Sequence, residues 1–156
     1  NLASSLNNLS NRLSELGRSE EALEAVTEAV DVYRQLTAAH PDAFQPDLAG
    51  SLNNLSNTLR ELGRGEEALE AVTEAVDVYR QLTAAHPDAF QPNLAGSLNN
   101  LSNTLGELGR REEALEAITE AVTIRRKLSL VRPAVYQAAL EQSLAVLAWL
   151  QELDGE

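Results

Sequence analysis

Leucines recur along the chain at the spacing of a helical stripe. In residues 47–62 they are four, three, four and three residues apart: Leu48, Leu52, Leu55, Leu59 and Leu62. This spacing places all five on one side of a helix with 3.6 residues per turn. Gly63 follows at the place of a helix-ending glycine, and residues 65–85 carry a second apolar stripe with the same period. The pattern therefore predicts two helices joined by a short turn.

This helix pair recurs with a period of 46 residues. Residues 3–48 and 49–94 differ at only five of 46 positions, and the third unit follows the same pattern up to Val122. We expect one domain, 1–156, made of units 1–48, 49–94 and 95–140 and a terminal helix in 141–156. The expected helices cover residues 2–16, 19–39, 47–62, 65–85, 93–108, 111–131 and 135–153. Asp47 is expected to cap the third helix, and 86–92 to form a loop in which Phe90 packs over a helix end.

One such helix pair is too small to bury both of its apolar faces. Stacked on copies of itself it can bury them, and such stacking makes a solenoid. Small residues at Ala68 and Ala75 would let neighbouring helices approach closely. The repeat therefore predicts an all-α array of antiparallel helix pairs.

The run Leu55, Gly63, Ala68, Val72 and Ala75 resembles the tetratricopeptide repeat signature. The stretches His86-Pro87-Asp88 and Leu98-Asn99-Asn100-Leu101 are similar to the longer variant found in kinesin light chains and many bacterial arrays. The usual period of the family is about 34 residues, which is shorter than the period here. The resemblance implies an all-α, right-handed superhelical solenoid that binds partner proteins in its concave groove.

A polar face lies opposite the leucine stripe of each first helix. It carries nine asparagines: Asn7, Asn8, Asn11, Asn53, Asn54, Asn57, Asn99, Asn100 and Asn103. In a solenoid of the resembled type this helix lines the groove, so we expect the asparagines to bind an extended peptide. An amide both donates and accepts, and so can bond the N–H and C=O groups of a peptide backbone. Two alternatives are hydrogen bonds between adjacent repeats and a solvated polar face.

The terminal helix departs from this pattern. Ala145, Val146 and Trp149 occupy the places of the three asparagines, so the helix is apolar on nearly every side. This composition is typical of a helix that is buried on more than one side. Trp149 is a candidate anchor for a ligand at the end of the groove. The alternative is a capping helix.

The composition argues against catalysis and against a metal or cofactor site. The chain has no Cys, which excludes thiolate chemistry. His40 and His86 lie one repeat apart in His-Pro-Asp segments, too far apart to share one ion easily. The many carboxylates fall on the polar side of amphipathic helices, where burial does not separate their pKa values. We therefore expect a non-enzymatic protein without metal or cofactor.

The charge points to protein partners. The formal net charge is −12, of which −9 falls within residues 1–94. An acidic chain is repelled by nucleic acid and by anionic membranes. No run of apolar residues is long enough to span a bilayer. We expect a cytoplasmic, bacterial-type interaction scaffold whose protein or peptide partner carries basic side chains, together with weak homo-association through apolar ends. The alternatives are a structural spacer or self-assembly element, or the sensor arm of a larger signalling ATPase or protease.

Overall fold

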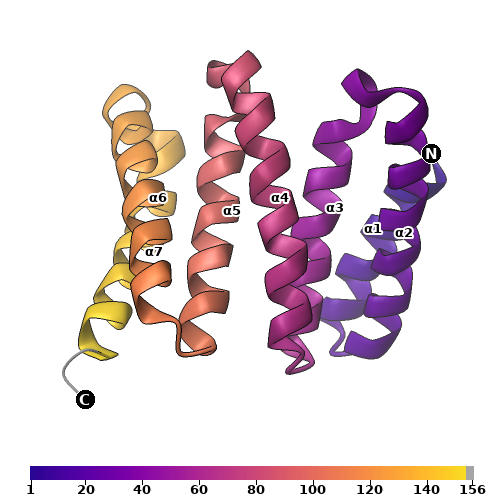
Figure 1. Cartoon of the computed structure of the whole chain (residues 1–156), viewed down its shortest axis with the longest axis horizontal. Coiled ribbons are helices and arrows are strands. Elements are labelled where there is room, and N and C mark those ends of the chain that lie inside the picture. The colour runs from indigo at the N-terminus through magenta and orange to yellow at the C-terminus, as the bar shows by residue number, and fades with distance from the viewer. Residues whose placement is uncertain (154–156) are drawn as a thin grey trace. The chain divides into compact units, whose positions relative to one another are not determined.

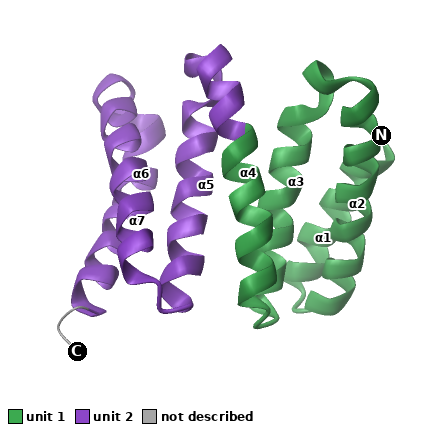
Figure 2. Ribbon diagram, in the orientation of Figure 1, with its two compact units in different colours: residues 1–78 green, residues 79–156 purple. Residues whose placement is uncertain are grey.

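The computed structural model describes residues 1–153, which form seven helices and no strand (Figure 1). The helices are α1 (Leu2–Glu15), α2 (Ser19–Ala39), α3 (Pro41–Glu61), α4 (Gly65–Ala85), α5 (Pro87–Glu107), α6 (Arg111–Val131) and α7 (Pro133–Leu153). The last three residues of the expected terminal unit 141–156 lie outside the described residues. The chain divides into two compact units, 1–78 and 79–156 (Figure 2), and each is described by itself.

The predicted turn between first and second helices is confirmed. Gly63 has a φ of +75°, a left-handed conformation that glycine adopts without steric cost. Its N–H donates to the carbonyl of Arg60 at 3.0 Å, and the N–H of Arg64 donates to the carbonyl of Leu59 at 2.9 Å. These two bonds satisfy carbonyls that the helix end leaves free. The second helices 19–39, 65–85 and 111–131 begin and end where the sequence predicts.

The first helices begin earlier than predicted. α3 starts at Pro41 and α5 at Pro87, so the predicted cap at Asp47 and the predicted loop 86–92 around Phe90 are both wrong. Pro46 lies inside α3, where its missing N–H and its ring disfavour a helix by about 3 kcal/mol. Phe44 offsets this cost because it packs against the buried cluster that α2 and α3 share. Packing therefore outweighs local propensity here.

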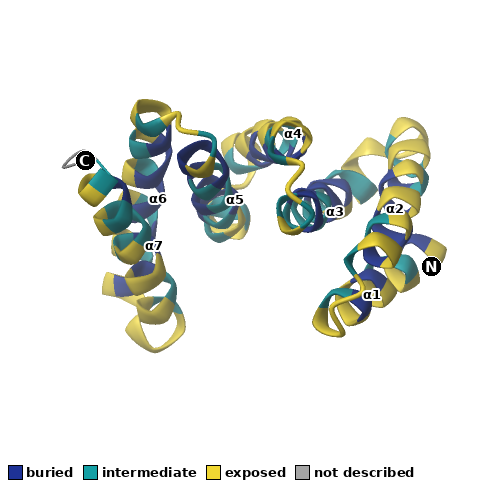
Figure 3. Cartoon of the chain, turned by 90° about the horizontal axis from the view of Figure 1, so that it is seen from below, coloured by how far each residue is buried: buried dark blue, intermediate teal, exposed yellow. Residues whose placement is uncertain are grey.

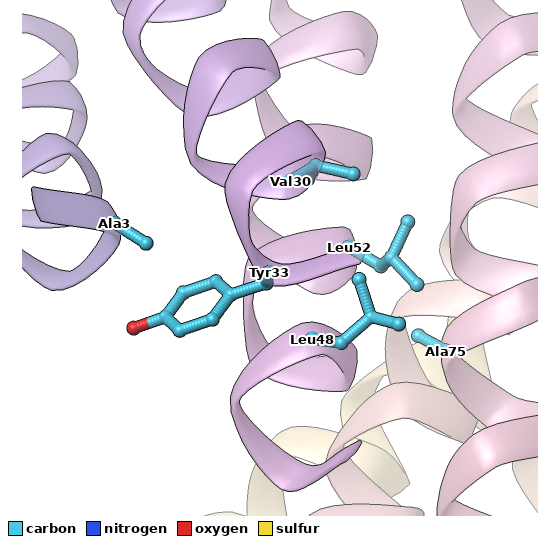
Figure 4. Close-up of a cluster of buried hydrophobic side chains, with 6 residues drawn as sticks. All are labelled: Ala3, Val30, Tyr33, Leu48, Leu52 and Ala75. Atoms are coloured by element: carbon cyan, nitrogen blue, oxygen red, sulfur yellow. The ribbon is translucent and has the colours of Figure 1, made fainter. Parts of the chain in front are cut away.

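In the unit 1–78, helix α2 supplies the side chains that join α3 and α4. Val30 of α2 packs with Leu48 and Leu52 of α3 and with Ala75 of α4 (Figure 4). Ala75 is fully buried, as a close helix crossing requires. The burial of Ala75 is compatible with the predicted role of the small residues, and the close approach of the helices stays a prediction.

A serine ties each first helix to the second helix of its own repeat. The hydroxyls of Ser10, Ser56 and Ser102 donate to backbone carbonyls of α2, α4 and α6 at 2.7, 2.8 and 2.7 Å. All three serines are buried. In the unit 79–156 buried positions also lie along the sides on which α6 and α7 face one another (Figure 3). The result is a helical array in which each first helix stays in fixed register with its second helix.

Candidate peptide-binding face

The nine asparagines fall into three sets of three, one set on each of α1, α3 and α5. The unit 1–78 holds the sets of α1 and α3, and the unit 79–156 holds the set of α5. Asn8 and Asn11 are exposed, and Asn54 and Asn57 are half-buried. Asn53, Asn100 and Asn103 are also half-buried. We call these nine residues the asparagine face.

The first asparagine of a set bonds to the next first helix. The amide nitrogen of Asn7 on α1 donates to the hydroxyl of Ser51 on α3 at 2.7 Å. The hydroxyl of Ser143 on α7 donates to the amide oxygen of Asn99 on α5 at 2.9 Å. Both pairs span 44 residues, and Asn99 is only 2% exposed. Hydrogen bonding between adjacent repeats, one of the alternatives from the sequence, is therefore confirmed for Asn7 and Asn99.

On α1 and α3 the second and third asparagines differ from Asn7 and Asn99. The side-chain amides of Asn8, Asn11, Asn54 and Asn57 form no hydrogen bond with other groups of residues 1–153. These amides therefore keep their donors and acceptors for water or for a ligand. The side-chain amide of Asn103 on α5 likewise forms no hydrogen bond with other groups of residues 1–153. Within the unit 1–78 this leaves four amides from two adjacent first helices.

A tyrosine of α2 closes the junction between α1 and α3. Tyr33 is 3% exposed, and its ring extends away from Leu52 and Ala75, to the side where α1 carries Ala3 (Figure 4). Burial raises the pKa of Tyr33, the negative charge of Asp47 adds to the rise, and a hydrogen bond with Ser4 opposes it. The hydroxyl therefore lies between the first helices α1 and α3, where Ser4 of α1 and Asp47 of α3 both act on it.

An arginine closes the equivalent junction between α5 and α7. Arg125 occupies the place of Tyr33 and is 9% exposed. Its Nη1 donates to the hydroxyl of Ser143 at 2.8 Å and to the carbonyl of Ala139 at 3.0 Å, with the amide oxygens of Asn99 and Gln142 at 3.4 Å. Burial lowers the pKa of Arg125. Neutral oxygens of both helices therefore solvate this charge.

Trp149 packs against a glycine of α5. A Cβ atom built on Gly106 would lie 2.7 Å from the Trp149 ring and 2.8 Å from Leu150, so a side chain there would collide with α7. The carbonyl of the same Leu150 accepts a hydrogen bond from Arg111 of α6 at 2.8 Å. Trp149 is half-buried in this setting. Its ring therefore helps to hold α7 against α5, and the residue stays partly accessible to solvent.

Arg125, Arg111 and Gly106 were not singled out as site residues by the sequence analysis. The sequence could have indicated them, because at each of these positions the third unit has a different residue from the first and second units. The corresponding residues of the second unit are Tyr79, Gly65 and Arg60. Their shared contact with α7 becomes visible only in three dimensions.

Bidentate ion pairs join the second helices of consecutive repeats. Arg34 of α2 donates to both carboxylate oxygens of Glu74 of α4 at 2.6 and 2.8 Å. Arg80 and Glu120 repeat the arrangement at 2.7 and 2.8 Å. The hydrogen bond from Arg80 lowers the pKa of Glu120, its positive charge adds to that lowering, and partial burial opposes both. These pairs are half-exposed, so solvent screens them.

Residues 1–153 contain no group of three or more His, Asp or Glu side chains placed to hold a metal ion. Over the same residues, no helix combines the length and the apolar composition that a membrane crossing needs.

Comparison with known families gives two matches. One tetratricopeptide repeat model matches residues 47–127, just over half of the chain, and a second matches residues 2–42. The chain belongs to the tetratricopeptide repeat family. The resemblance seen in the sequence is thereby confirmed, and with it the all-α repeat fold. A tetratricopeptide repeat domain is typically a non-catalytic module for protein–protein interaction. Among curated protein sequences, none matches this chain.

Solved structures share the fold at low sequence identity. The apo form of RapI superposes with a TM-score of 0.81 at 14% identity, over 98% of this chain and 49% of RapI. This chain thus spans about half the length of RapI. The first tetratricopeptide domain of Spaghetti (RPAP3), bound to the HSP90 peptide SRMEEVD, has a TM-score of 0.68 at 14% identity over 99% of this chain and 94% of that one. BtubC from P. vanneervenii gives 0.66 at 18% identity, over 99% and 63%.

Proposed function

We propose that this tetratricopeptide repeat domain binds an extended segment of a partner protein through the asparagine face, without catalysing a reaction on it. The observation that carries the proposal is the group of four amides at Asn8, Asn11, Asn54 and Asn57, which have no partner within residues 1–153. Asparagine is a weak helix former, so three per helix need a compensating role. Hydrogen bonding to a peptide backbone supplies that role.

The chemistry of the face fits main-chain recognition. Each free amide offers an acceptor and two donors, the complement of a peptide unit. The adjacent first helices α1 and α3 each carry two of these amides, so a peptide lying across both helices would contact all four. Trp149 of α7 is the candidate apolar anchor in the unit 79–156, because it is half-buried and stands one repeat after Asn103 of α5. A peptide with basic side chains is favoured by the acidic charge of residues 1–94.

A peptide array tests the proposal. The full chain is screened against 15-residue peptides, and the best binder is then measured by calorimetry with the Asn54→Ala, Asn57→Ala variant. We expect the affinity to fall at least tenfold, because two amides lose their contacts with the peptide. Gln35→Ala is the matched control, since Gln35 is an exposed amide on the second helix α2. Equal affinity in all three proteins, or no binder on the array, would favour the spacer alternative.

A further inference from the structure

The turn between α6 and α7 carries three large apolar side chains on its surface. Leu130 and Val131, the last two residues of α6, are 82% and 80% exposed, and Val135 in the first turn of α7 is 59% exposed. The N–H of Val135 donates to the carbonyl of Arg132 at 3.1 Å, so the connection between the two helices is short and tight. Single exposed apolar residues are common on protein surfaces, whereas a group of them is typical of an interaction site.

The same positions hold alanine at the other turns of this kind. Ala84, Ala85 and Ala89 are exposed at the turn between α4 and α5, although the complete helices α5 and α6 follow them. The turn between α2 and α3 has exposed alanines at the same places: Ala38, Ala39 and Ala43. Exposure is therefore a property of this place in the repeat, and the third unit differs by placing larger apolar residues there.

The charge around this turn is reversed relative to the second unit. Residues 75–94 contain two carboxylates, Asp77 and Asp88, and one arginine. The corresponding residues 121–140 contain no carboxylate, three arginines and the only lysine of the chain. A basic, apolar turn thus stands within a chain whose formal net charge is −12.

Three of these cations are exposed beside the apolar residues. Arg126 and Lys127 precede Leu130 and Val131 by four residues, a spacing that makes neighbours on a helix surface. Arg132 follows Val131 directly. None of the three cations forms an ion pair with other groups of residues 1–153. We call these residues the α6–α7 patch: Arg126, Lys127, Leu130, Val131, Arg132 and Val135.

We propose that the α6–α7 patch binds an acidic segment of a partner protein. Apolar side chains of the segment cover Leu130, Val131 and Val135, and its carboxylates pair with the three exposed cations. Charge complementarity of this kind steers association and excludes partners of the wrong sign. The site takes a partner of opposite charge to the one proposed for the asparagine face.

An anionic membrane is less suited to the patch than a protein segment. A bilayer faces much of the molecule at once, and the net charge of −12 repels it. A short segment contacts only the patch, and carboxylates farther away than about 8 Å are largely screened at physiological salt.

The patch can be reverted to the residues of the second unit. The apolar reversion is Leu130→Ala, Val131→Ala, Val135→Ala, and the charge reversion is Lys127→Gln, Arg132→His. Because the same residues occupy an equivalent turn of the same chain, we expect both variants to fold, and circular dichroism checks this.

Fluorescently labelled peptides of about 12 residues, in which Asp or Glu alternates with Leu, Ile or Phe, provide the probes. Their anisotropy is titrated with the full chain and its variants. We expect saturable binding that weakens at least tenfold in the apolar reversion, since three side chains lose their buried contacts. The charge reversion should weaken it about threefold, because exposed ion pairs contribute little each.

Two control variants and one transplant sharpen the test. Leu16→Ala removes an exposed leucine outside the patch and should leave the affinity unchanged, as should Asn54→Ala, Asn57→Ala. The transplant builds the patch on the turn between α4 and α5: Gln81→Lys, Ala84→Leu, Ala85→Val, His86→Arg and Ala89→Val. We expect the transplant to bind two peptides per chain where the original binds one.

Absence of binding up to about 1 mM peptide would overturn the proposal, since weaker contacts are not specific. Equal affinity in the original chain and the apolar reversion would also overturn it. Vesicles of phosphatidylcholine and phosphatidylserine provide a further arm. Vesicle binding that the apolar reversion abolishes, without peptide binding, would assign the patch to a membrane instead. Self-association that the apolar reversion abolishes, again without peptide binding, would assign it to a second copy.

Discussion

The junction between α1 and α3 and the junction between α5 and α7 share a geometry and differ in chemistry. In both, one side chain of a second helix reaches between two first helices. In the unit 1–78 it is Tyr33, a member of the buried apolar cluster whose ring extends toward Ala3 of α1. In the unit 79–156 it is Arg125, surrounded by neutral oxygens of α5 and α7. The same position of the repeat thus holds a buried tyrosine in one unit and a buried, hydrogen-bonded arginine in the other.

Three residues at which the third unit differs from the second share one feature, which is a contact with α7. Arg125, Arg111 and Gly106 each replace a residue of the second unit, and each contacts α7. α7 itself has Trp149 at the register of a third asparagine. These three residues therefore fit α5 and α6 to a helix of different composition.

Removing the aromatic filler should have the largest effect. Tyr33→Ala leaves a cavity on the side of the buried cluster that faces Ala3, and we expect a loss of about 3–5 kcal/mol in the free energy of unfolding. Urea denaturation measures this loss. Tyr136→Ala provides a control of the same type, because Tyr136 is only half-buried near the start of α7. A loss below about 1 kcal/mol for Tyr33→Ala would mean that the ring does not fill the junction.

Removing the charged side chain should cost less. Arg125→Ala removes the donor that the hydroxyl of Ser143 and the carbonyl of Ala139 share, and we expect a loss of about 2–4 kcal/mol because a hydrogen-bonded charged group that holds α7 is lost. The exposed neighbour Arg126 provides the control, since Arg126→Ala should change stability by less than about 0.5 kcal/mol. Equal effects of the two substitutions would show that Arg125 is not bound by α7.

The contact between Gly106 and Trp149 can be tested by adding one methyl group. Gly106→Ala places a Cβ atom 2.7 Å from the Trp149 ring, and overpacking should outweigh the gain in helix propensity, for a net loss of about 1–2 kcal/mol. At Gly96 the nearest group is a nitrogen of Arg125 at 3.7 Å, so Gly96→Ala should stabilise by up to about 1 kcal/mol. Opposite signs for the two variants are the expected result. A gain at both positions would contradict the packing of α7 described above.

The ion pairs are common to both units and should give the smallest effects. Glu74→Gln and Glu120→Gln are each expected to lower stability by less than about 1 kcal/mol at neutral pH, because the pairs are half-exposed. The pKa of Glu120 in the folded chain lies below its ordinary value of 4.5. Its contribution is therefore complete above the unfolded pKa and is lost as the pH falls through the lower, folded value. Urea denaturation at pH 7 and pH 3 should show the Glu120→Gln difference shrinking, and an undiminished difference at pH 3 would contradict this.

The sequence predicted the helices, their pairing and the repeat, because leucine spacing and helix-ending glycines are local signals. It placed the start of α3 at Asp47, since Pro46 reads as a helix breaker when the packing of Phe44 is unknown. It grouped all nine asparagines together, because Asn7 and Asn8, although about 100° apart on a helical projection, both lie outside the leucine stripe. Only the position of Ser51 on the next first helix separates Asn7 from Asn8.

The division within the asparagine face is the central claim, and one paired measurement tests it directly. Unfolding free energy and affinity for the array peptide are measured for the Asn99→Ala variant and for the Asn54→Ala, Asn57→Ala variant. We expect Asn99→Ala to lose about 1–3 kcal/mol of stability, because Ser143 and Arg125 lose an acceptor. The double variant should lose at least tenfold in affinity and stay within about 0.5 kcal/mol in stability. A large loss of stability in the double variant, with affinity intact, would contradict the account.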